Sequence, residues 1–113
     1  MLQIHREILN EFRHINAGVI LYGSVATGSY DDESDIDLAI ISNEKRIFRE
    51  ADKIADKILL NYGKVVMLVN IRPEELKMRQ KWPFYENIIK NGVMISRGKR
   101  ADKRTGKGRI RSG

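Results

Sequence analysis

A long amphipathic helix between two apolar segments of strand length is the feature that most constrains how this chain of 113 residues can fold. Residues 44–60 carry apolar side chains at helical spacing, and residues 36–41 and 64–71 are apolar runs on either side of them. When a helix joins two strands of one sheet in this way, the strands are parallel and the crossover is right-handed in nearly all known cases. The sequence therefore predicts an α/β domain whose sheet is at least partly parallel.

Shorter segments predict the rest of the domain. Residues 2–16 have the spacing of an amphipathic helix, and residues 19–22 are a short apolar run between glycines that suits a buried strand. Pro73 and Pro83 each open a short helix, because proline is favoured at the first helical position, and residues 93–96 form a last strand. The expected fold class is α/β (α+β), with a small mixed sheet of about four strands flanked by helices.

The positive charge of the chain is concentrated at its C-terminal end. The formal net charge is +6, but residues 97–113 hold eight Lys or Arg and one acid, Asp102, whereas residues 1–96 are nearly neutral. This change of composition predicts a folded domain over residues 1–96 and a basic, flexible tail over residues 97–113. Such a tail is typically a solvated extension, and binding to RNA or DNA phosphates is the alternative use.

The composition also excludes some kinds of site. The chain has no cysteine, which excludes disulfides and thiolate metal sites. Its two histidines are nine residues apart and share a helical face poorly, so we expect no metal binding by histidine. No apolar stretch approaches the roughly 18 residues of a membrane-spanning helix. We therefore expect no membrane partner and a cytoplasmic location.

Two acidic side chains, Asp35 and Asp37, lie at the start of the apolar run 36–41. Successive side chains of a strand point to opposite faces, so these two carboxylates share one face and repel each other. A divalent cation between them would relieve the repulsion, and an all-oxygen site with few ligands favours Mg²⁺ or Mn²⁺. Gly23 and Ser24, at the end of the preceding strand, would hold phosphate groups, because glycine lets backbone N–H groups approach an anion.

Residues 23–38 combine a glycine-serine pair, a second glycine and the two aspartates at fixed spacing. They resemble the G-S-x3-G-x5-S-D-x-D-L signature of the DNA polymerase β-like nucleotidyltransferase superfamily, and the short chain is similar to the minimal nucleotidyltransferase (MNT) branch of that superfamily. Residues 83–95 resemble the closing helix and strand of its small members. The resemblance implies the polymerase β-like nucleotidyltransferase fold over residues 1–96.

The same resemblance implies a metal-dependent enzyme that transfers a nucleoside monophosphate to an acceptor, with AMP from ATP as the first choice among NTPs. Small members pair with HEPN-domain RNase toxins, so the implied acceptor is a tyrosine of such a toxin and the implied role is that of an antitoxin. Asp35 and Asp37 would be the catalytic residues and the ligands of Mg²⁺ (or Mn²⁺). Nucleotide binding is assigned to Gly23, Ser24, Gly28 and Ser34. Ser34 is expected to cap the turn that aims Asp35 rather than to touch the substrate.

The sequence differs from many members of this family in one respect. They carry a third carboxylate on the next strand, but residues 64–71 contain no acid, and Met67 or Asn70 takes that place. Glu74 and Glu75 follow a proline, and their position suits the start of a helix better than an active site. Three functions therefore stay open: a weak or partner-completed enzyme, an inactive nucleotide-binding module that neutralises a partner by binding, and an RNA-binding protein that uses its basic tail.

Aromatic residues offer candidates for a contact with the nucleotide base. Trp82, Phe84 and Tyr85 lie together beside a proline, where anchors of a core or an interface are more usual than a platform for a base. Tyr30 lies next to the proposed phosphate loop and is the better candidate for a base contact.

Overall fold

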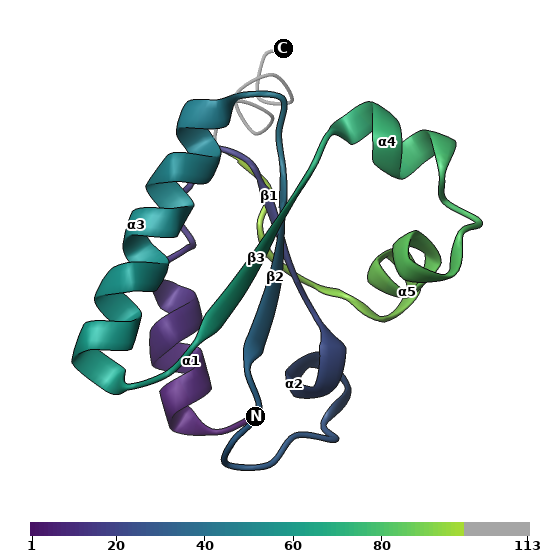
Figure 1. The fold of residues 1–113 in the computed structure, drawn as a ribbon. Helices are drawn as coiled ribbons and strands as arrows, with labels where there is room; N and C mark the ends of the chain where they lie inside the picture. The colour runs from purple at the N-terminus through teal and green to yellow at the C-terminus, as the bar shows by residue number, and fades with distance from the viewer. Residues whose placement is uncertain (99–113) are drawn as a thin grey trace, which may run out of the picture.

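A four-stranded sheet with the strand order β3-β2-β1-β4 forms the centre of the computed structural model, which describes residues 1–98 (Figure 1). The strands are β1 (Gly18–Tyr22), β2 (Ile36–Ile41), β3 (Val66–Ile71) and β4 (Val93–Ser96). All four overlap the segments predicted as strands, and the mixed sheet confirms the predicted fold class. Residues 99–113 lie outside the described residues, so the predictions for the basic tail stay predictions.

The strand pairing follows from the connections between the strands. β2 and β3 are parallel and in register over their full length, with Asp37 opposite Met67 and Ile41 opposite Ile71. The helix α3 (Lys45–Tyr62) joins them, as the strand–helix–strand pattern of the sequence predicts. β1 lies beside β2 and pairs with both β2 and β4 in the antiparallel sense.

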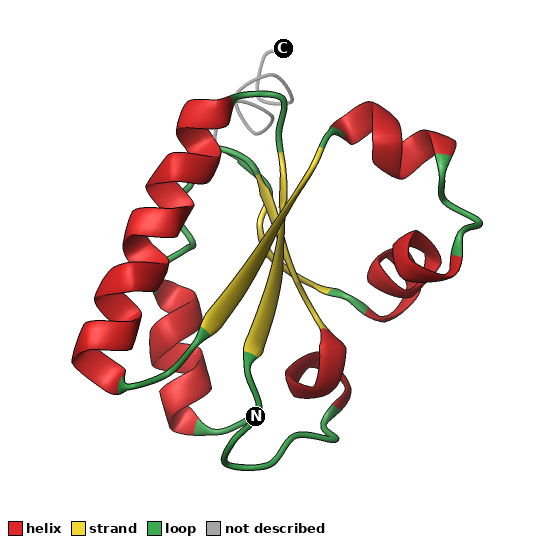
Figure 2. Cartoon of the chain, viewed as in Figure 1, coloured by secondary structure: helices red, strands yellow, loops and turns green. Residues whose placement is uncertain are grey.

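Helices cover both faces of the sheet (Figures 1 and 2). α1 (Gln3–Asn10) and α3 lie on one face, where the larger hydrophobic core includes Phe12, Leu38 and Ile58. α4 (Pro73–Met78) and α5 (Pro83–Asn91) lie on the other face, over a smaller core of Ile20, Ala39, Ile71 and Ile88. None of the helices within residues 1–98 is long and apolar enough to cross a membrane.

The first helix is shorter than the apolar spacing predicts. α1 ends at Asn10, and the chain continues in turns in which Phe12 donates to Leu9 and Ile15 donates to Phe12. These i to i−3 hydrogen bonds keep the helical spacing for one more turn, so the side chains of Phe12 and Ile15 remain fully buried. The predicted apolar face is therefore correct, although the predicted α-helical length is not.

The N-terminus of α3 lies one residue after the start of the predicted range 44–60. Ser42 and Asn43 have the composition of a helix cap, but the helix begins at Lys45 with Glu44 as its N-cap residue. Ser42 still contributes, because its hydroxyl accepts a hydrogen bond of 2.9 Å from the backbone N–H of Glu44. The serine thus stabilises the turn that leads into the helix rather than the first turn of the helix itself.

Candidate active site

Gly23 lies where β1 turns directly into the short helix α2 (Gly23–Thr27). Its φ of +78° lies in the region that favours glycine, and a Cβ at this position would overlap with Oδ2 of Asp37. Both observations require glycine here. They also show that the carboxylate of Asp37 lies against the backbone at the start of α2, where the first N–H groups of a helix have no partner inside the helix.

Gly28 ends the same helical turn. It has a φ of +86°, and its N–H donates to the carbonyl oxygen of Ser24 at 2.9 Å, as does the N–H of Ser29 at 3.0 Å. A Cβ on Gly28 would meet nothing within 4 Å, so the backbone conformation alone explains the glycine. Gly28 therefore shapes the loop that begins at Gly23 and Ser24, while a direct contact of these residues with a nucleotide stays a prediction.

The acid pair, Asp35 and Asp37, lies at the start of β2. Asp35 is exposed and precedes the strand, whereas Asp37 is half-buried within it. Burial and the neighbouring Asp35 carboxylate both raise the pKa of Asp37. The folded protein therefore holds the Asp37 carboxylate in a less hydrated environment than the unfolded chain does, and beside a second negative charge.

Asp37 has a defined neighbour on each adjoining strand. Its partner on β1 is Tyr22, and its partner on β3 is Met67. Burial and the charge of Asp37 raise the pKa of the Tyr22 phenol, so this hydroxyl stays protonated at neutral pH. Tyr22 is a neighbour that the sequence motif does not reveal, because only the antiparallel register brings it beside the acid.

The loop before Asp35 is held by a compact turn. The backbone N–H of Asp31 donates to the hydroxyl of Ser34 at 2.9 Å, and the N–H of Ser34 donates to the carbonyl of Asp31 at 3.2 Å. Ser34 therefore occupies the turn-capping position expected for it, and its assignment to nucleotide binding stays untested. Lys64 Nζ ties the same loop to the start of β3 by donating to the carbonyl of Asp32 at 2.8 Å.

An open pocket of about 240 Å³ lies between this loop and the turn before β3. Asp35 lines it together with Ser34, Lys64 and neighbouring residues of both segments. The pocket gives one member of the acid pair access to solvent and to small ligands. Lys64 is a residue of the site that the sequence does not point to, because its contact with Asp32 spans 32 positions of the chain.

The two residues proposed for the place of the third acid lie on different faces of the sheet. Met67 follows Asp37 in register and lies on the same face, since Val69 and Ile71 two and four residues later pack with the smaller core. Asn70 lies on the opposite face, where it lines a pocket with Phe48 of α3. Of the two residues, Met67 is therefore the one that lies beside Asp37 on its face of the sheet.

Glu74 and Glu75 lie at the other end of β3, in the first turn of α4, as the sequence predicts. The backbone N–H of Arg72 donates to Glu75 and lowers the pKa of this carboxyl, and the guanidinium groups of Arg72 and Arg79 lower it further. The length of β3 between Met67 and Ile71 separates α4 from the acid pair by roughly 13 Å. Glu75 is thus a helix cap and not a ligand of the site.

Two carboxylates are suitable ligands for a divalent cation. Two neighbouring carboxylates, one of which has its pKa raised by burial and by the other's charge, fit Mg²⁺ or Mn²⁺. These cations usually take one or two carboxylates and complete their shell with water and phosphate oxygens. Within residues 1–98, no group of three or more His, Cys, Asp or Glu side chains is arranged to hold a metal. Within these residues the site therefore offers two carboxylates, and a cation held there would need further ligands from water or substrate.

Three of the aromatic candidates for a base contact already contact other side chains of the protein. Tyr30 contacts the ring of His5 edge-on at 4.8 Å and packs against the larger core. Phe84 contacts Tyr22 edge-on at 5.6 Å, and the guanidinium of Arg79 lies 4.7 Å from the centre of the Trp82 ring. A base contact by any of these side chains stays a prediction.

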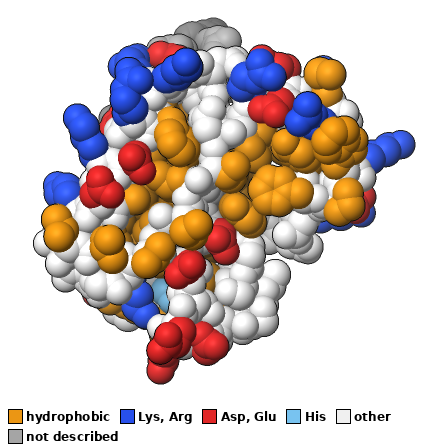
Figure 3. Space-filling view, in the orientation of Figure 1, with side chains coloured by type: hydrophobic (Ala, Val, Ile, Leu, Met, Phe, Trp, Pro, Cys, Tyr) orange, Lys and Arg blue, Asp and Glu red, His pale blue; other side chains and the backbone are white. Residues whose placement is uncertain are grey.

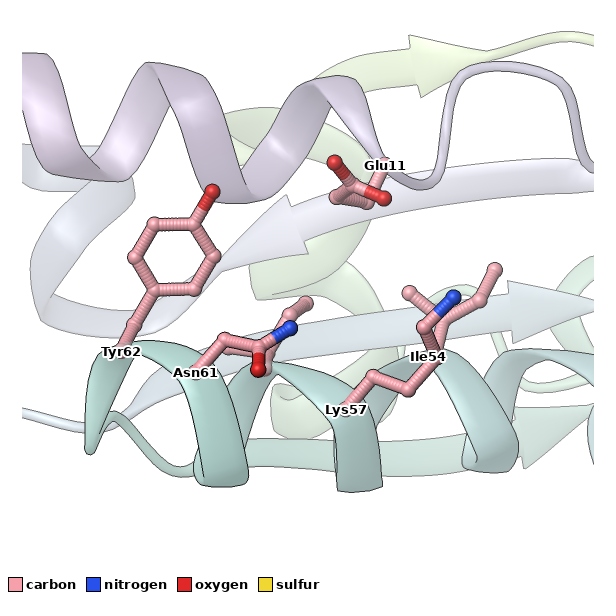
Figure 4. Close-up of a pocket in the computed structure, with 6 residues that line it drawn as sticks. Glu11, Ile54, Lys57, Asn61 and Tyr62 are labelled. Atoms are coloured by element: carbon pink, nitrogen blue, oxygen red, sulfur yellow. The ribbon is translucent and has the colours of Figure 1, made fainter.

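A further pocket of about 250 Å³ lies between the end of α1 and the C-terminal half of α3 (Figure 4). Figure 4 shows the side chains of Lys57, Asn61 and Tyr62 rising from α3, with Glu11 on the facing segment. This pocket lies on the face of the sheet opposite to Asp37. Ile36 and Leu38, the neighbours of Asp37 on β2, point to the face covered by α1 and α3, so Asp37 points to the other face. It is separate from the candidate active site.

Comparison with known proteins agrees with this geometry. A family model described as a nucleotidyltransferase domain matches residues 2–95. The chain is 34% identical over 77 residues to "Putative protein adenylyltransferase MJ0604" of Methanocaldococcus jannaschii, covering 68% of this chain and 75% of that protein. It is 36% identical over 80 residues to "Putative protein adenylyltransferase MJ0141" of the same organism, covering 68% of this chain and 76% of that protein.

A solved structure has a similar fold. It is described as the crystal structure of a toxin-antitoxin with AMP-PNP, and it superposes with a TM-score of 0.52 at 19% sequence identity, covering 95% of this chain and 82% of that chain. At this identity the likeness shows the fold. The family model and the two sequence relatives establish that this chain belongs to the nucleotidyltransferase domain family and is a nucleotidyltransferase, as the motif in residues 23–38 predicts.

Proposed function

We propose that this protein transfers AMP from ATP to a hydroxyl group of a partner protein, with a divalent cation held by Asp35 and Asp37. The contact of the Asp37 carboxylate with the backbone of Gly23 carries the proposal, because it joins a cation site to the start of the phosphate loop. The names of the two sequence relatives, both protein adenylyltransferases, support ATP as the donor and a protein as the acceptor. The fold neighbour that holds AMP-PNP supports an adenine nucleotide.

The roles of the residues follow from their positions. Backbone N–H groups at the start of α2 would bind the β- and γ-phosphates, and Gly28 keeps the loop in the conformation that presents them. Asp35 and Asp37 would hold the cation, which supplies charge neutralisation at the α-phosphate and at the departing pyrophosphate. The turn capped by Ser34, together with the Lys64 contact, fixes the backbone that carries Asp35. Catalysis of this kind depends on positioning rather than on covalent chemistry by the protein.

The partner would dock beside the acid pair. The face that carries Asp37 also exposes large apolar side chains of β3, α4 and α5, and Figure 3 shows apolar side chains gathered over the α4 and α5 side of this face. We name this the apolar surface and define it by Met67, Met78, Trp82 and Phe84, which are 42–80% exposed. A patch of this kind marks a protein interaction site on a small domain.

The partner we propose is a toxin, with this chain as its antitoxin, because the fold neighbour is a toxin-antitoxin complex. A tyrosine of a HEPN-domain RNase is the acceptor that the resemblance favours. A second candidate function, neutralisation of the partner by binding without transfer, is favoured by Met67 in the place of the third acid. Covalent labelling separates the two functions.

The test uses ATP labelled at the α-phosphate, Mg²⁺ and a tyrosine-containing peptide as the acceptor. We expect label on the peptide and release of pyrophosphate with the wild-type protein, and neither product with the Asp35→Asn/Asp37→Asn double variant. Asp56→Asn, on the exposed side of α3, is the matched control and should keep both products. Transfer by the double variant would contradict the assignment of the acid pair, and binding of ATP without any transfer would favour the second function.

A further inference from the structure

The face of the sheet opposite to the acid pair carries a pocket that combines an aromatic ring with positive charge. This open pocket of about 240 Å³ lies between the first turns of α3 and the end of β3, and it is lined by Lys45, Phe48, Arg49 and Asn70. Phe48 is half-buried and packs against the larger core, whereas the other three side chains are exposed. A ring, an amide and two cations are therefore accessible from solvent at one place.

The two cations of this pocket are not used by the protein itself. Arg46 pairs with Glu44 at 3.1 Å, but within residues 1–98 neither Lys45 nor Arg49 forms an ion pair or a side-chain hydrogen bond. Asp52, in the next turn of α3, does not line the pocket. Cations near the start of a helix are also unfavourable, because this end of the helix dipole is positive. Both charges are thus available to an anion from outside.

The basic tail begins at the same end of the sheet as this pocket. Strand register places Asn70, Ile40, Val19 and Ser96 in one row across the four strands. Neighbouring strands are about 4.8 Å apart, so Ser96 lies roughly 14 Å from Asn70, a distance that about five extended residues can span. Residues 97–113, which follow Ser96, contain eight Lys or Arg and one acid. Figure 3 also shows Lys and Arg side chains gathered over the upper end of α3, where this helix begins in Figure 1.

We propose that this pocket binds single-stranded RNA, with a base stacked on Phe48 and hydrogen-bonded to the Asn70 amide. Lys45 and Arg49 bind the phosphates beside that base. Aromatic rings next to cations are the usual contacts of single-stranded nucleic acids, and an asparagine amide can both donate to and accept from a base edge. The bases of a duplex are stacked inside it, whereas the loops and ends of RNA expose unpaired bases that can enter such a pocket.

The tail explains why an RNA strand fits this surface better than a free nucleotide does. A single nucleotide meets the pocket alone, while a strand also offers its neighbouring phosphates to the cations of residues 97–113. Contacts linked in one chain bind far more tightly than either contact alone. The inference does not depend on the proposed transfer reaction, because the acid pair lies on the other face of the sheet.

The test is fluorescence anisotropy of a labelled single-stranded RNA of about 12 nucleotides, titrated with the full chain. EDTA is present, so that the cation proposed for the acid pair is removed. We expect Phe48→Leu to weaken binding by at least about fivefold, because leucine keeps an apolar contact with the core but has no aromatic face. Lys45→Gln/Arg49→Gln should also weaken binding, and it should reduce the slope of log affinity against log salt by about 1.4, as expected for two lost phosphate contacts.

A matched control removes the same charge elsewhere on α3. Lys53→Gln/Lys57→Gln changes two exposed positions further along the helix and should bind the RNA much more tightly than Lys45→Gln/Arg49→Gln does. Urea unfolding checks that the variants are folded, and Lys45→Gln/Arg49→Gln should be at least as stable as the wild type, since it removes cations from the positive end of the helix dipole.

Several results would overturn the proposal. Equal losses of affinity in the two double variants would mean that net charge alone attracts the RNA, and wild-type affinity in Phe48→Leu would exclude stacking on this ring. A duplex RNA that binds as tightly as the single strand, or AMP that competes as strongly as the RNA, would contradict a site for a single strand. The Asp35→Asn/Asp37→Asn variant should bind RNA like the wild type, which separates this test from that of the transfer reaction.

Discussion

Repulsion within the acid pair should make the metal-free wild type less stable than its Asp37→Asn variant. Side chains two residues apart on a strand are separated by roughly 6.6 Å, and two charges at that distance repel by about 0.6 kcal/mol in water and about 2.5 kcal/mol at an effective dielectric constant of about 20. Asp35 is exposed and Asp37 half-buried, so a value of roughly 1 kcal/mol is appropriate. Asp37→Asn also removes the burial of a charge, which acts in the same direction.

Thermal and urea unfolding in EDTA at low salt measures this difference. For a domain of this size, about 1 kcal/mol corresponds to an increase of roughly 4–8 °C in Tm. Asp35→Asn should show a smaller increase, and the double variant should gain less than the sum of the two, because the repulsion can be removed only once. Asp56→Asn, an exposed change on α3, is the control and should leave Tm unchanged.

The pH dependence has a definite sign. The raised pKa of Asp37 means that the folded state binds its proton more tightly than the unfolded state, so the wild type loses stability relative to Asp37→Asn as the pH rises through the carboxyl range. The advantage of the variant should be absent at strongly acidic pH and complete at neutral pH. Strict additivity of the two single variants, or a destabilised Asp37→Asn, would contradict the close placement of the two carboxylates.

Three further changes test other parts of the structure. Gly23→Ala should destabilise the protein more than Gly28→Ala does, and it should abolish ATP binding. Both glycines have a positive φ, but only the Cβ added at position 23 would overlap the Asp37 carboxylate. Urea unfolding measures the stabilities of the two variants, and calorimetry measures their ATP binding. The free energy of unfolding of the wild type should fall as the pH drops below about 6.5. Burial, then Lys64 and the N-terminus, lower the pKa of His5, so the unfolded chain binds that proton more tightly than the folded protein does. A free energy of unfolding that is flat between about pH 5 and pH 7, or a decrease that His5→Gln shares, would contradict this. Trp82→Ser should weaken capture of a co-expressed toxin, whereas Leu60→Ser, at an 84% exposed position of α3, should not, and equal losses would exclude the apolar surface as the docking site.

The fold could be predicted largely from local patterns. The strand–helix–strand pattern around α3 fixes the parallel pair, and the prolines at positions 73 and 83 mark the starts of α4 and α5. The end of α1 could not be predicted, because turns with i to i−3 hydrogen bonds bury Phe12 and Ile15 at the same spacing as an α-helix does. Periodicity reports which side chains face the core and not how the backbone between them is hydrogen-bonded.

In the candidate site, too, only the residues that lie close together in the sequence could be predicted from it. The motif in residues 23–38 identifies the acid pair and the glycine turn, because these residues are close in sequence. Tyr22 and Lys64 reach the site through strand register and a contact across 32 positions, and no local pattern contains that information. The choice of Met67 over Asn70 needs the register and face of β3, since both residues lie on the same predicted strand.

Calorimetric titration of ATP, with and without Mg²⁺, tests most directly whether the acid pair and the phosphate loop form one nucleotide site. We expect the wild type to bind ATP only when Mg²⁺ is present. The Asp35→Asn/Asp37→Asn variant should unfold no earlier than the wild type and should not bind ATP. ATP binding that is equally strong in the double variant, or that needs no cation, would contradict the proposal that Asp35 and Asp37 hold the metal beside Gly23.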